Sequence, residues 1–252
     1  MWRGRGGEVM QNTNVEWAHK TWNPMHGCTP ISRGCNYCYA ARMARRLRAM
    51  AMKGYESGFK VTLERGKLGE PLKIKKPSRI FVCSMGDLFH KDVPDEFIKD
   101  VFVEMFRANR HTFMVLTKRA ERMAKGPEGE DAWLWTKGIW AGVTVEDKAR
   151  LERLEHLRKV PAVVRFVSFE PLLEDVGELD LTGIHWVIVG GETGAGARLM
   201  GLDWARRIRD QAVAAGVPFF FKKAGGVHGG SGLLDGEVFH QFPEVPWERD
   251  SM

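Results

Sequence analysis

Three cysteines lie within eleven residues near the start of the chain, at Cys28, Cys35 and Cys38, and the fourth, Cys83, stands apart. Thiolates grouped in this way are typical ligands of a metal ion or an iron–sulfur cluster, and they differ from the cysteine framework of a small secreted protein. Three thiolates can hold three irons of a [4Fe–4S] cluster and leave the fourth iron free. The segment therefore predicts a metal centre with one open position.

The same residues leave two other interpretations open. Zinc could bind the three thiolates together with His26 or His19 in a closed structural site, or the thiols could carry no metal. Zinc modules tend to use two short C-x2-C pairs, and this chain has one, Cys35 and Cys38. A chain with a large core of its own also has no need of zinc in order to fold. We therefore favour the iron–sulfur cluster, and we expect Cys83 to be a buried small apolar residue, with a role beside the cluster as the alternative.

The composition indicates a chain that can bury a large core. Of its 252 residues, 44% are hydrophobic and 28% are charged, which excludes wholesale disorder. No apolar run approaches the roughly 18 residues that span a bilayer, and residues 1–14 lack the apolar centre of a signal peptide. We therefore expect a cytoplasmic protein without a membrane partner. Residues 1–12 should form a loose tail and residues 13–252 a single α/β domain, with the cysteine loop at residues 26–40.

Positive charge is concentrated in one part of the chain. The net charge is +6, but residues 39–79 contain twelve Lys and Arg against three Glu, a net of +9. A basic segment directly after the cysteines favours an anionic partner, and nucleic acid, DNA or RNA, is the leading candidate. The alternative is a solvated helix face followed by a flexible basic loop. The candidate phosphate contacts on the expected helix are Arg42, Arg45, Arg46 and Arg48.

Two sets of apolar residues belong to the same question. The inner side of the basic helix should carry Ala41, Ala44 and Leu47, with Met43 and Met50 beside them. Tryptophan side chains could stack on nucleic-acid bases, although packing in the core is the favoured interpretation. These tryptophans are Trp17, Trp22, Trp133, Trp135 and Trp140.

Six short apolar runs alternate with helical patterns along the rest of the chain. Such runs are typical of parallel strands covered on both faces, and the alternation predicts right-handed βαβ units. We therefore expect a partial or complete α/β barrel, similar to a TIM barrel, with a doubly wound open sheet as the alternative. The expected strands are Arg79–Ser84, Thr112–Thr117, Ile139–Thr144, Val163–Phe169, His185–Gly190 and Pro218–Lys222, with a further one within Trp22–Cys28. The expected helices are Asp95–Asn109, Glu146–Lys159 and Leu202–Ala215, and their inner faces should include Phe106 in the first and Val213 in the third.

Each apolar run ends in polar residues, and in a barrel these ends meet at one mouth. Carboxylates there could bind ribose hydroxyls and an ammonium group, while Lys118, Arg119 and Lys222 could hold a carboxylate or a phosphate. Each charged residue could instead be a helix cap or an ion-pair partner. The candidate carboxylates are Asp87, Glu146, Glu170 and Glu192, and the candidate hydroxyls are Ser84, Thr117 and Ser168. Gly190 and Gly191 would let the backbone approach a ligand closely, or would simply form a tight turn.

The cysteine segment resembles the cluster-binding loop of the radical SAM superfamily. In that superfamily the loop follows the first strand of a partial α/β barrel, and an aromatic residue usually precedes the last cysteine, as Tyr37 does here. The usual spacing there is C-x3-C-x2-C, whereas this chain has C-x6-C-x2-C, so that a longer loop displaces the first cysteine. Over about residues 14–243 the chain also resembles the phage-type three-cysteine-motif proteins of phages and bacteria. The matching segments include Thr21-Trp22-Asn23-Pro24, Gly34-Cys35-Asn36-Tyr37-Cys38-Tyr39, Ser84-Met85-Gly86-Asp87, Leu116-Thr117-Lys118-Arg119, Gly142-Val143-Thr144-Val145-Glu146, Ser168-Phe169-Glu170-Pro171 and Gly190-Gly191-Glu192.

The resemblance implies an enzyme with two cofactors, a [4Fe–4S] cluster and S-adenosylmethionine (SAM). Cys28, Cys35 and Cys38 would ligate the iron, Tyr37 could pack against the adenine, and the residues at the mouth would bind SAM. An external electron donor such as flavodoxin or ferredoxin would reduce the cluster. The expected reaction is the modification of an unactivated carbon, on a nucleic-acid base in the favoured case, and no side chain can be assigned as hydrogen donor or general base. The alternatives are a zinc-containing nucleic-acid-binding module and a radical SAM enzyme for a small metabolite or peptide.

Overall fold

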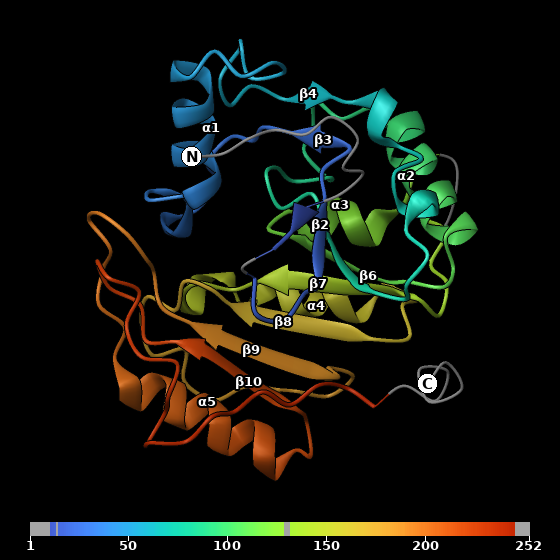
Figure 1. Ribbon diagram of the computed structural model, residues 1–252. Coiled ribbons are helices and arrows are strands. Elements are labelled where there is room, and N and C mark those ends of the chain that lie inside the picture. Colours follow the sequence, from blue (N-terminus) through green and yellow to red (C-terminus); the bar gives the residue numbers. More distant parts are fainter. Residues whose placement is uncertain (1–10, 14, 129–131, 245–252) are drawn as a thin grey trace.

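Seven parallel strands form one curved sheet in a computed structural model that describes residues 11–13, 15–128 and 132–244 (Figure 1). The strands are neighbours in the order of the sequence: β2 (Lys20–Trp22), β5 (Arg79–Val82), β6 (Thr112–Thr117), β7 (Ile139–Thr144), β8 (Arg165–Phe169), β9 (Trp186–Gly190) and β10 (Phe219–Lys223). β1 (Gln11–Asn12) pairs antiparallel with β2 at one edge. β1 and β10 are not paired with each other, so the sheet is an open, partial barrel.

This architecture confirms the predicted α/β partial barrel. A doubly wound sheet reverses its strand order at a switch point, and the strictly sequential order here excludes that alternative. The complete barrel is also excluded for the described residues, because the two edge strands do not meet. None of the helices in the described residues is long and apolar enough to span a membrane.

Alternation along the strands divides the core into two parts, because successive strand side chains point to opposite faces. On the outer face, strand residues pack against α2 (Asp95–Arg107), α3 (Ala120–Lys125), α4 (Glu152–Arg158) and α5 (Leu202–Ala214). The inner face is filled by large aromatic side chains from the strands, among them Trp140, Phe166, Trp186 and Phe220. The lower part of the barrel interior is therefore packed, which leaves the polar strand ends as its one open side within the described residues.

Gly142 shows how closely this inner layer is packed. A Cβ added at Gly142 would lie 2.3 Å from the Phe166 ring. At the open edge, Lys223 Nζ lies 2.9 Å from Glu16 Oε1, so an ion pair links the end of β10 to the segment before β2. Residues after β10 return antiparallel alongside it, since Phe221 N donates to Phe239 O at 2.7 Å, and Phe242 then packs on Trp186 with 5.1 Å between ring centroids.

Most predicted strand boundaries agree with the structure to within two residues, and the differences have local causes. The run Trp22–Cys28 is not one strand: the chain turns at Asn23–Pro24, so that β2 ends at Trp22 and β3 (Met25–His26) pairs with β4 (Thr62–Leu63) in a separate two-stranded sheet. The helix predicted over Glu146–Lys159 begins only at Glu152, after a short 3-10 helix at Lys148–Arg150.

Four side chains predicted on inner helix faces are exposed instead. Phe106 and Val213 point outward from α2 and α5, and Met43 and Met50 lie on the exposed side of α1 (Tyr39–Ala49). α1 buries only Ala40 and Ala44, since it does not lie against the outer face of the sheet but stands apart from the other helices (Figure 1). Of the expected loose tail, residues 1–10 lie outside the described residues, and residues 11 and 12 form β1.

Candidate functional site

The cysteine segment, residues 28–38, lies at the carboxyl ends of the parallel strands. Its first end is held by backbone bonds, since Gly27 N donates to Met85 O at 2.9 Å and Cys28 N donates to Phe59 O at 3.2 Å. Its second end contains a short 3-10 helix, Arg33–Cys35, and leads into α1. All three thiols are half-buried and none forms a disulfide. Cys83 is fully buried, as expected for a small apolar residue.

Arg119, just beyond the end of β6, binds the first cysteine. Its Nη1 lies 3.3 Å from Cys28 Sγ and 2.8 Å from Asp87 Oδ2, while its Nη2 donates to the Thr29 carbonyl at 3.0 Å. Asp87 also accepts bonds from Thr117 Oγ1 at 2.7 Å and from the Phe89 amide at 3.1 Å. Burial and the Asp87 carboxylate raise the pKa of Cys28, and the Arg119 guanidinium opposes that rise.

The middle of the segment rests on a buried carboxylate. Ser32 Oγ donates to Glu146 Oε1, and Glu146 Oε2 accepts a bond of 2.7 Å from Arg153 Nη1. The Glu146 side chain is fully buried and Lys118 Nζ lies 3.6 Å from it. Gly34 passes so close that a Cβ there would lie 2.4 Å from Glu146 Cγ. The middle of the cysteine segment is therefore hydrogen-bonded to Glu146 and packed against it.

Two arginines fasten the second end to the loop after β9. Arg198 Nη2 donates to the Arg33 carbonyl at 3.0 Å and lies 2.6 Å from Glu192 Oε1. Arg42 of α1 donates in the opposite direction, to the carbonyl of Thr193 at 2.5 Å and to that of Ala195 at 3.1 Å. The guanidinium of Arg198 also lies over the Tyr37 ring, 5.3 Å from its centroid. The bonds of Arg198 outweigh burial and lower the pKa of Glu192.

Inside the barrel mouth, the last inward-facing positions of β8 to β10 form one polar group. Lys222 Nζ lies 2.7 Å from Glu170 Oε1, and Ser168 Oγ donates to Glu170 Oε2 at 3.0 Å. Burial alone would raise the pKa of Glu170, but Lys222 and Ser168 more than compensate, and the pKa is lowered. Gly191 lies against the next loop, since a Cβ there would be 2.1 Å from the Ala224 carbonyl oxygen.

Each of the four candidate carboxylates is thus already paired with a cation. Asp87 pairs with Arg119, Glu146 with Arg153, Glu170 with Lys222 and Glu192 with Arg198. The structure places Thr117 on Asp87, and Ser84 near the first residue of α1, where the Tyr39 hydroxyl donates to the Ser84 carbonyl. A ligand in the mouth would have to share or replace these partners. Ser32, Arg153 and Arg198 were not identified from the sequence. Ser32 bonds to Glu146 and Arg198 bonds to the Arg33 carbonyl, both more than 100 residues away, whereas Arg153 lies only seven residues from Glu146 but on a helix that looks exposed in the sequence.

The residues considered for nucleic acid separate into two kinds. Arg45, Arg46 and Arg48 are exposed on α1, whereas Arg42 is occupied with the loop after β9. Trp17, Trp22, Trp133 and Trp140 are buried, and Trp135 is partly buried against the core. These tryptophans pack in the core and do not offer faces for base stacking.

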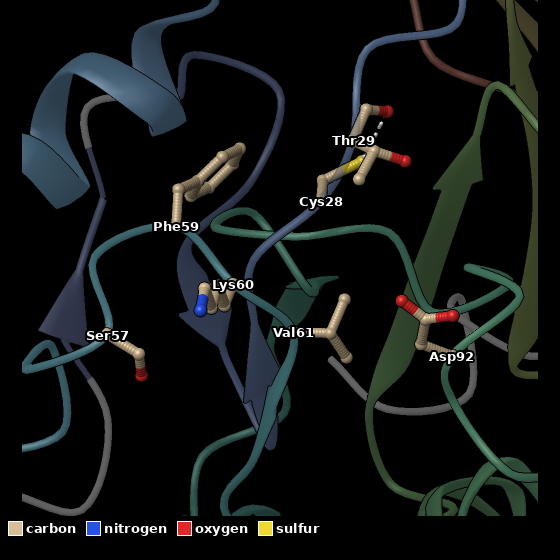
Figure 2. Close-up of a pocket in the computed structure, with 7 residues that line it drawn as sticks. All are labelled: Cys28, Thr29, Ser57, Phe59, Lys60, Val61 and Asp92. Carbon is tan, nitrogen blue, oxygen red and sulfur yellow. Dashed lines mark hydrogen bonds between the residues drawn. The ribbon is translucent and has the colours of Figure 1, made fainter.

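A pocket of about 520 Å³ opens beside Cys28 (Figure 2). It is lined by Cys28, Thr29 and Asp92 and by Ser57, Phe59, Lys60 and Val61 from the segment before β4. The first thiol is therefore accessible from outside the barrel.

The three thiols of the segment are the candidate metal ligands. Three half-buried thiols on one segment fit the three-thiolate ligand set of a [4Fe–4S] cluster, whose ligands bind different irons. Among the described residues, no three His, Cys, Asp or Glu side chains surround one point as ligands of a single ion. Of the two histidines considered for zinc, His19 accepts the Arg79 amide on Nδ1 at 3.0 Å. The His26 ring stacks on Tyr55 with 4.4 Å between centroids, and its Nε2 is buried without a hydrogen-bond partner in the part of the chain that the structure describes.

Fold and site together define a partial α/β barrel protein with a three-cysteine segment fastened across its mouth. By sequence the chain belongs to the family described as "Protein of unknown function (DUF5131)", whose model matches residues 12–243. No curated protein matches the chain. Among solved structures it is similar to spore photoproduct lyase complexed with dinucleoside spore photoproduct, with a TM-score of 0.47 and 11% identity over 82% of this chain and 64% of that chain. A mutant of spore photoproduct lyase matches with a TM-score of 0.47 and 10% identity, over 82% of this chain and 64% of that one. The chain thus corresponds to less than two thirds of the length of those proteins.

Proposed function

We propose that this protein is an iron–sulfur enzyme of the radical SAM type, in which Cys28, Cys35 and Cys38 bind a [4Fe–4S] cluster. The observation that carries the proposal is that the one segment holding all three cysteines is fastened at both ends over the carboxyl ends of a parallel half-barrel. That edge is where barrel enzymes gather their functional groups. The resemblance of the cysteine segment and of the mouth motifs to the superfamily supports the same assignment.

When bound, the cluster and SAM would supply a carbon radical that can take a hydrogen atom from an unactivated carbon. The residues of this chain would bind and orient the reactants and exclude water from them. Glu170 and Glu192 offer carboxylate oxygens for hydroxyl and ammonium groups, and Lys222 offers a cation for a carboxylate. Gly190 and Gly191 bring backbone close to the same place, and Tyr37 offers an aromatic face beside the last cysteine.

SAM cleavage tests this assignment. The anaerobically prepared protein, reduced with dithionite, is expected to convert SAM to 5′-deoxyadenosine and methionine. Cys28→Ala, Cys35→Ala and Cys38→Ala should each abolish that conversion, whereas Cys83→Ala, a cysteine outside the segment, should retain it. Equal loss in all four variants, or turnover by the three segment variants, would contradict the proposal.

We further propose that the substrate is a nucleic acid that contacts the exposed side of α1. The observation favouring it is that Arg45, Arg46 and Arg48 are all exposed on one short helix that directly follows the cysteine segment. Arg42 is left out of this surface, because it binds backbone carbonyls instead.

Salt-dependent binding tests the nucleic-acid surface. If each of the three arginines contacts one phosphate of a duplex, their joint replacement by Ala should reduce the slope of log K against log salt by about 2.7. The control replaces three exposed lysines elsewhere, Lys125, Lys148 and Lys159, by Ala and should leave the slope nearly unchanged. If both triple variants lower the slope equally, binding depends on overall charge and not on α1. If the α1 variant leaves the slope unchanged, nucleic acid does not contact this surface.

A further inference from the structure

The three cysteines are not positioned by the same means. Cys35 and Cys38 are fixed to each other by local backbone, because Cys35 ends a 3-10 helix and the Cys38 amide donates to the Cys35 carbonyl at 3.3 Å. Cys28 is separated from Cys35 by six residues, a stretch too long for one turn to fix the distance between the two thiols. An outside group has to set the position of the Cys28 side chain.

Arg119 is the group that contacts it. The guanidinium donates to Cys28 Sγ at 3.3 Å and to the Thr29 carbonyl at 3.0 Å, and thus binds both the thiol and the backbone that follows it. Only 12% of the Arg119 side chain is exposed. The planar fork of an arginine places donors on separate nitrogens in a fixed geometry, so one side chain can reach both atoms, whereas the donors of a lysine all lie on one nitrogen.

Arg119 is itself held in place. Asp87 Oδ2 accepts from Arg119 Nη1 at 2.8 Å, and the other oxygen of Asp87 is bonded to Thr117 Oγ1 at 2.7 Å and to the Phe89 amide at 3.1 Å. The Arg119 amide donates to Thr117 Oγ1 at 2.8 Å. These partners come from the ends of β5 and β6, so the arginine transmits the rigid geometry of the sheet to the first cysteine.

We propose that Arg119, oriented by Asp87, is the positioning residue that sets Cys28 in place for cluster binding and so compensates for the long C-x6-C spacing. The part of this inference that concerns the cluster rests on the proposed function. The part that concerns the segment itself does not, because the contacts exist between residues of the chain alone. Once iron is bound, a hydrogen bond from Arg119 to a ligating sulfur would also raise the reduction potential, since hydrogen bonds to the sulfurs favour the more negative reduced state.

Hydrogen exchange of the full-length, metal-free chain tests the positioning role. In Arg119→Gln, the amides of Gly27 and Cys28, which donate to Met85 and Phe59, should exchange about tenfold faster than in the wild-type protein, while residues 33–38 and the amides of β6 and β7 should be unaffected. Arg119→Lys, which keeps the charge without the fork, should restore part of the protection. Asp87→Asn, which releases the guanidinium, should act in the same direction as Arg119→Gln.

The matched control is Arg198→Gln, which removes the arginine at the other end of the segment. It should speed exchange at residues 33–38 and leave Gly27 and Cys28 unchanged, because Arg198 binds the Arg33 carbonyl. Wild-type exchange at Gly27 and Cys28 in Arg119→Gln would overturn the proposal. If Arg119→Gln and Arg198→Gln both speed exchange along the whole segment to the same extent, the proposal would be overturned as well.

Cluster binding supplies a second readout on the anaerobically reconstituted protein. Arg119→Gln should hold less iron per chain than the wild type, and the iron it holds should have a more negative midpoint potential, with Arg119→Lys in between. A wild type that binds no iron, combined with faster exchange at Gly27 and Cys28 in Arg119→Gln, would contradict the proposed function and support Arg119 as the anchor. If the wild type and Arg119→Gln hold equal iron with equal potential and exchange equally, the proposed function stands and the role of Arg119 is overturned.

Discussion

Replacing Glu146 by Gln should destabilise the protein severely, because it breaks an ion pair that is almost completely buried. The side chains of Glu146 and Arg153 are 0% and 5% exposed, and Nη1 lies 2.7 Å from Oε2. Removing one partner of such a pair leaves the other charge buried without compensation, which costs roughly 3–5 kcal/mol. The Gln amide oxygen can still accept one bond from Arg153 or Ser32, and Arg153 retains its bond to the Thr144 carbonyl. We therefore expect a loss near the lower end, about 3 kcal/mol.

Urea denaturation at pH 7, followed by tryptophan fluorescence, measures this loss of stability as a lower midpoint of unfolding. The slope of the unfolding free energy against urea concentration should not change. A paired replacement, Glu146→Leu with Arg153→Met, removes both charges and should cost less than Glu146→Gln alone. The control is Glu152→Gln, an exposed residue at the start of α4, which should change stability by less than about 0.5 kcal/mol. A cost below about 1 kcal/mol for Glu146→Gln, or a paired variant less stable than the single one, would refute this account of the support under the cysteine segment.

Two further predictions concern the interior of the barrel. Gly142→Ala should cost about 1–3 kcal/mol, because the new Cβ would lie 2.3 Å from the Phe166 ring, whereas Gly66→Ala, where no atom lies within 4 Å, should be nearly neutral in the same thermal-unfolding measurement. If both variants melt alike, the close packing of the inner layer is wrong. Lys222→Met should lower stability at neutral pH, and the difference from the wild type should shrink as the pH falls below about 4.5, the ordinary pKa of Glu170. The pKa of Glu170 is lowered in the folded protein, so the stability that the protein gains from the Glu170–Lys222 pair is present above that pH and is lost when Glu170 is protonated. If denaturation at a series of pH values gave a constant difference in stability between the variant and the wild type, the pairing would be contradicted.

The strands could be predicted well from the sequence because their signal is local. The runs at Thr112–Thr117 and Ile139–Thr144 were predicted exactly, since each is a continuous apolar stretch bounded by polar or glycine residues. The boundary at Glu146 could not be predicted in this way. Its charge fits an exposed helix start, but the chain turns inward there, and the partner that makes burial possible, Arg153, follows only in the helix itself.

The site was predictable as a place but not as a set of contacts. Parallel strands must bring their carboxyl ends together, so the collection of Asp87, Glu170 and Lys222 at one edge follows from the fold class. Two of the carboxylates pair with cations from distant segments, Asp87 with Arg119 and Glu170 with Lys222, and the sequence does not show which partner each will find. Arg42 illustrates this: within a row of similar arginines nothing marks it, and only the carbonyls of Thr193 and Ala195 distinguish its role from that of Arg45 and Arg46.

The metal content of the anaerobically purified protein tests the central claim most directly. The measurement is iron, sulfide and zinc per chain, with the visible spectrum, for the wild type, for the joint Cys28→Ala, Cys35→Ala and Cys38→Ala variant, and for Cys83→Ala. We predict about four irons and four sulfides per chain and a brown colour in the wild type and in Cys83→Ala, and the loss of both in the triple variant. One zinc per chain without iron or sulfide would contradict the account.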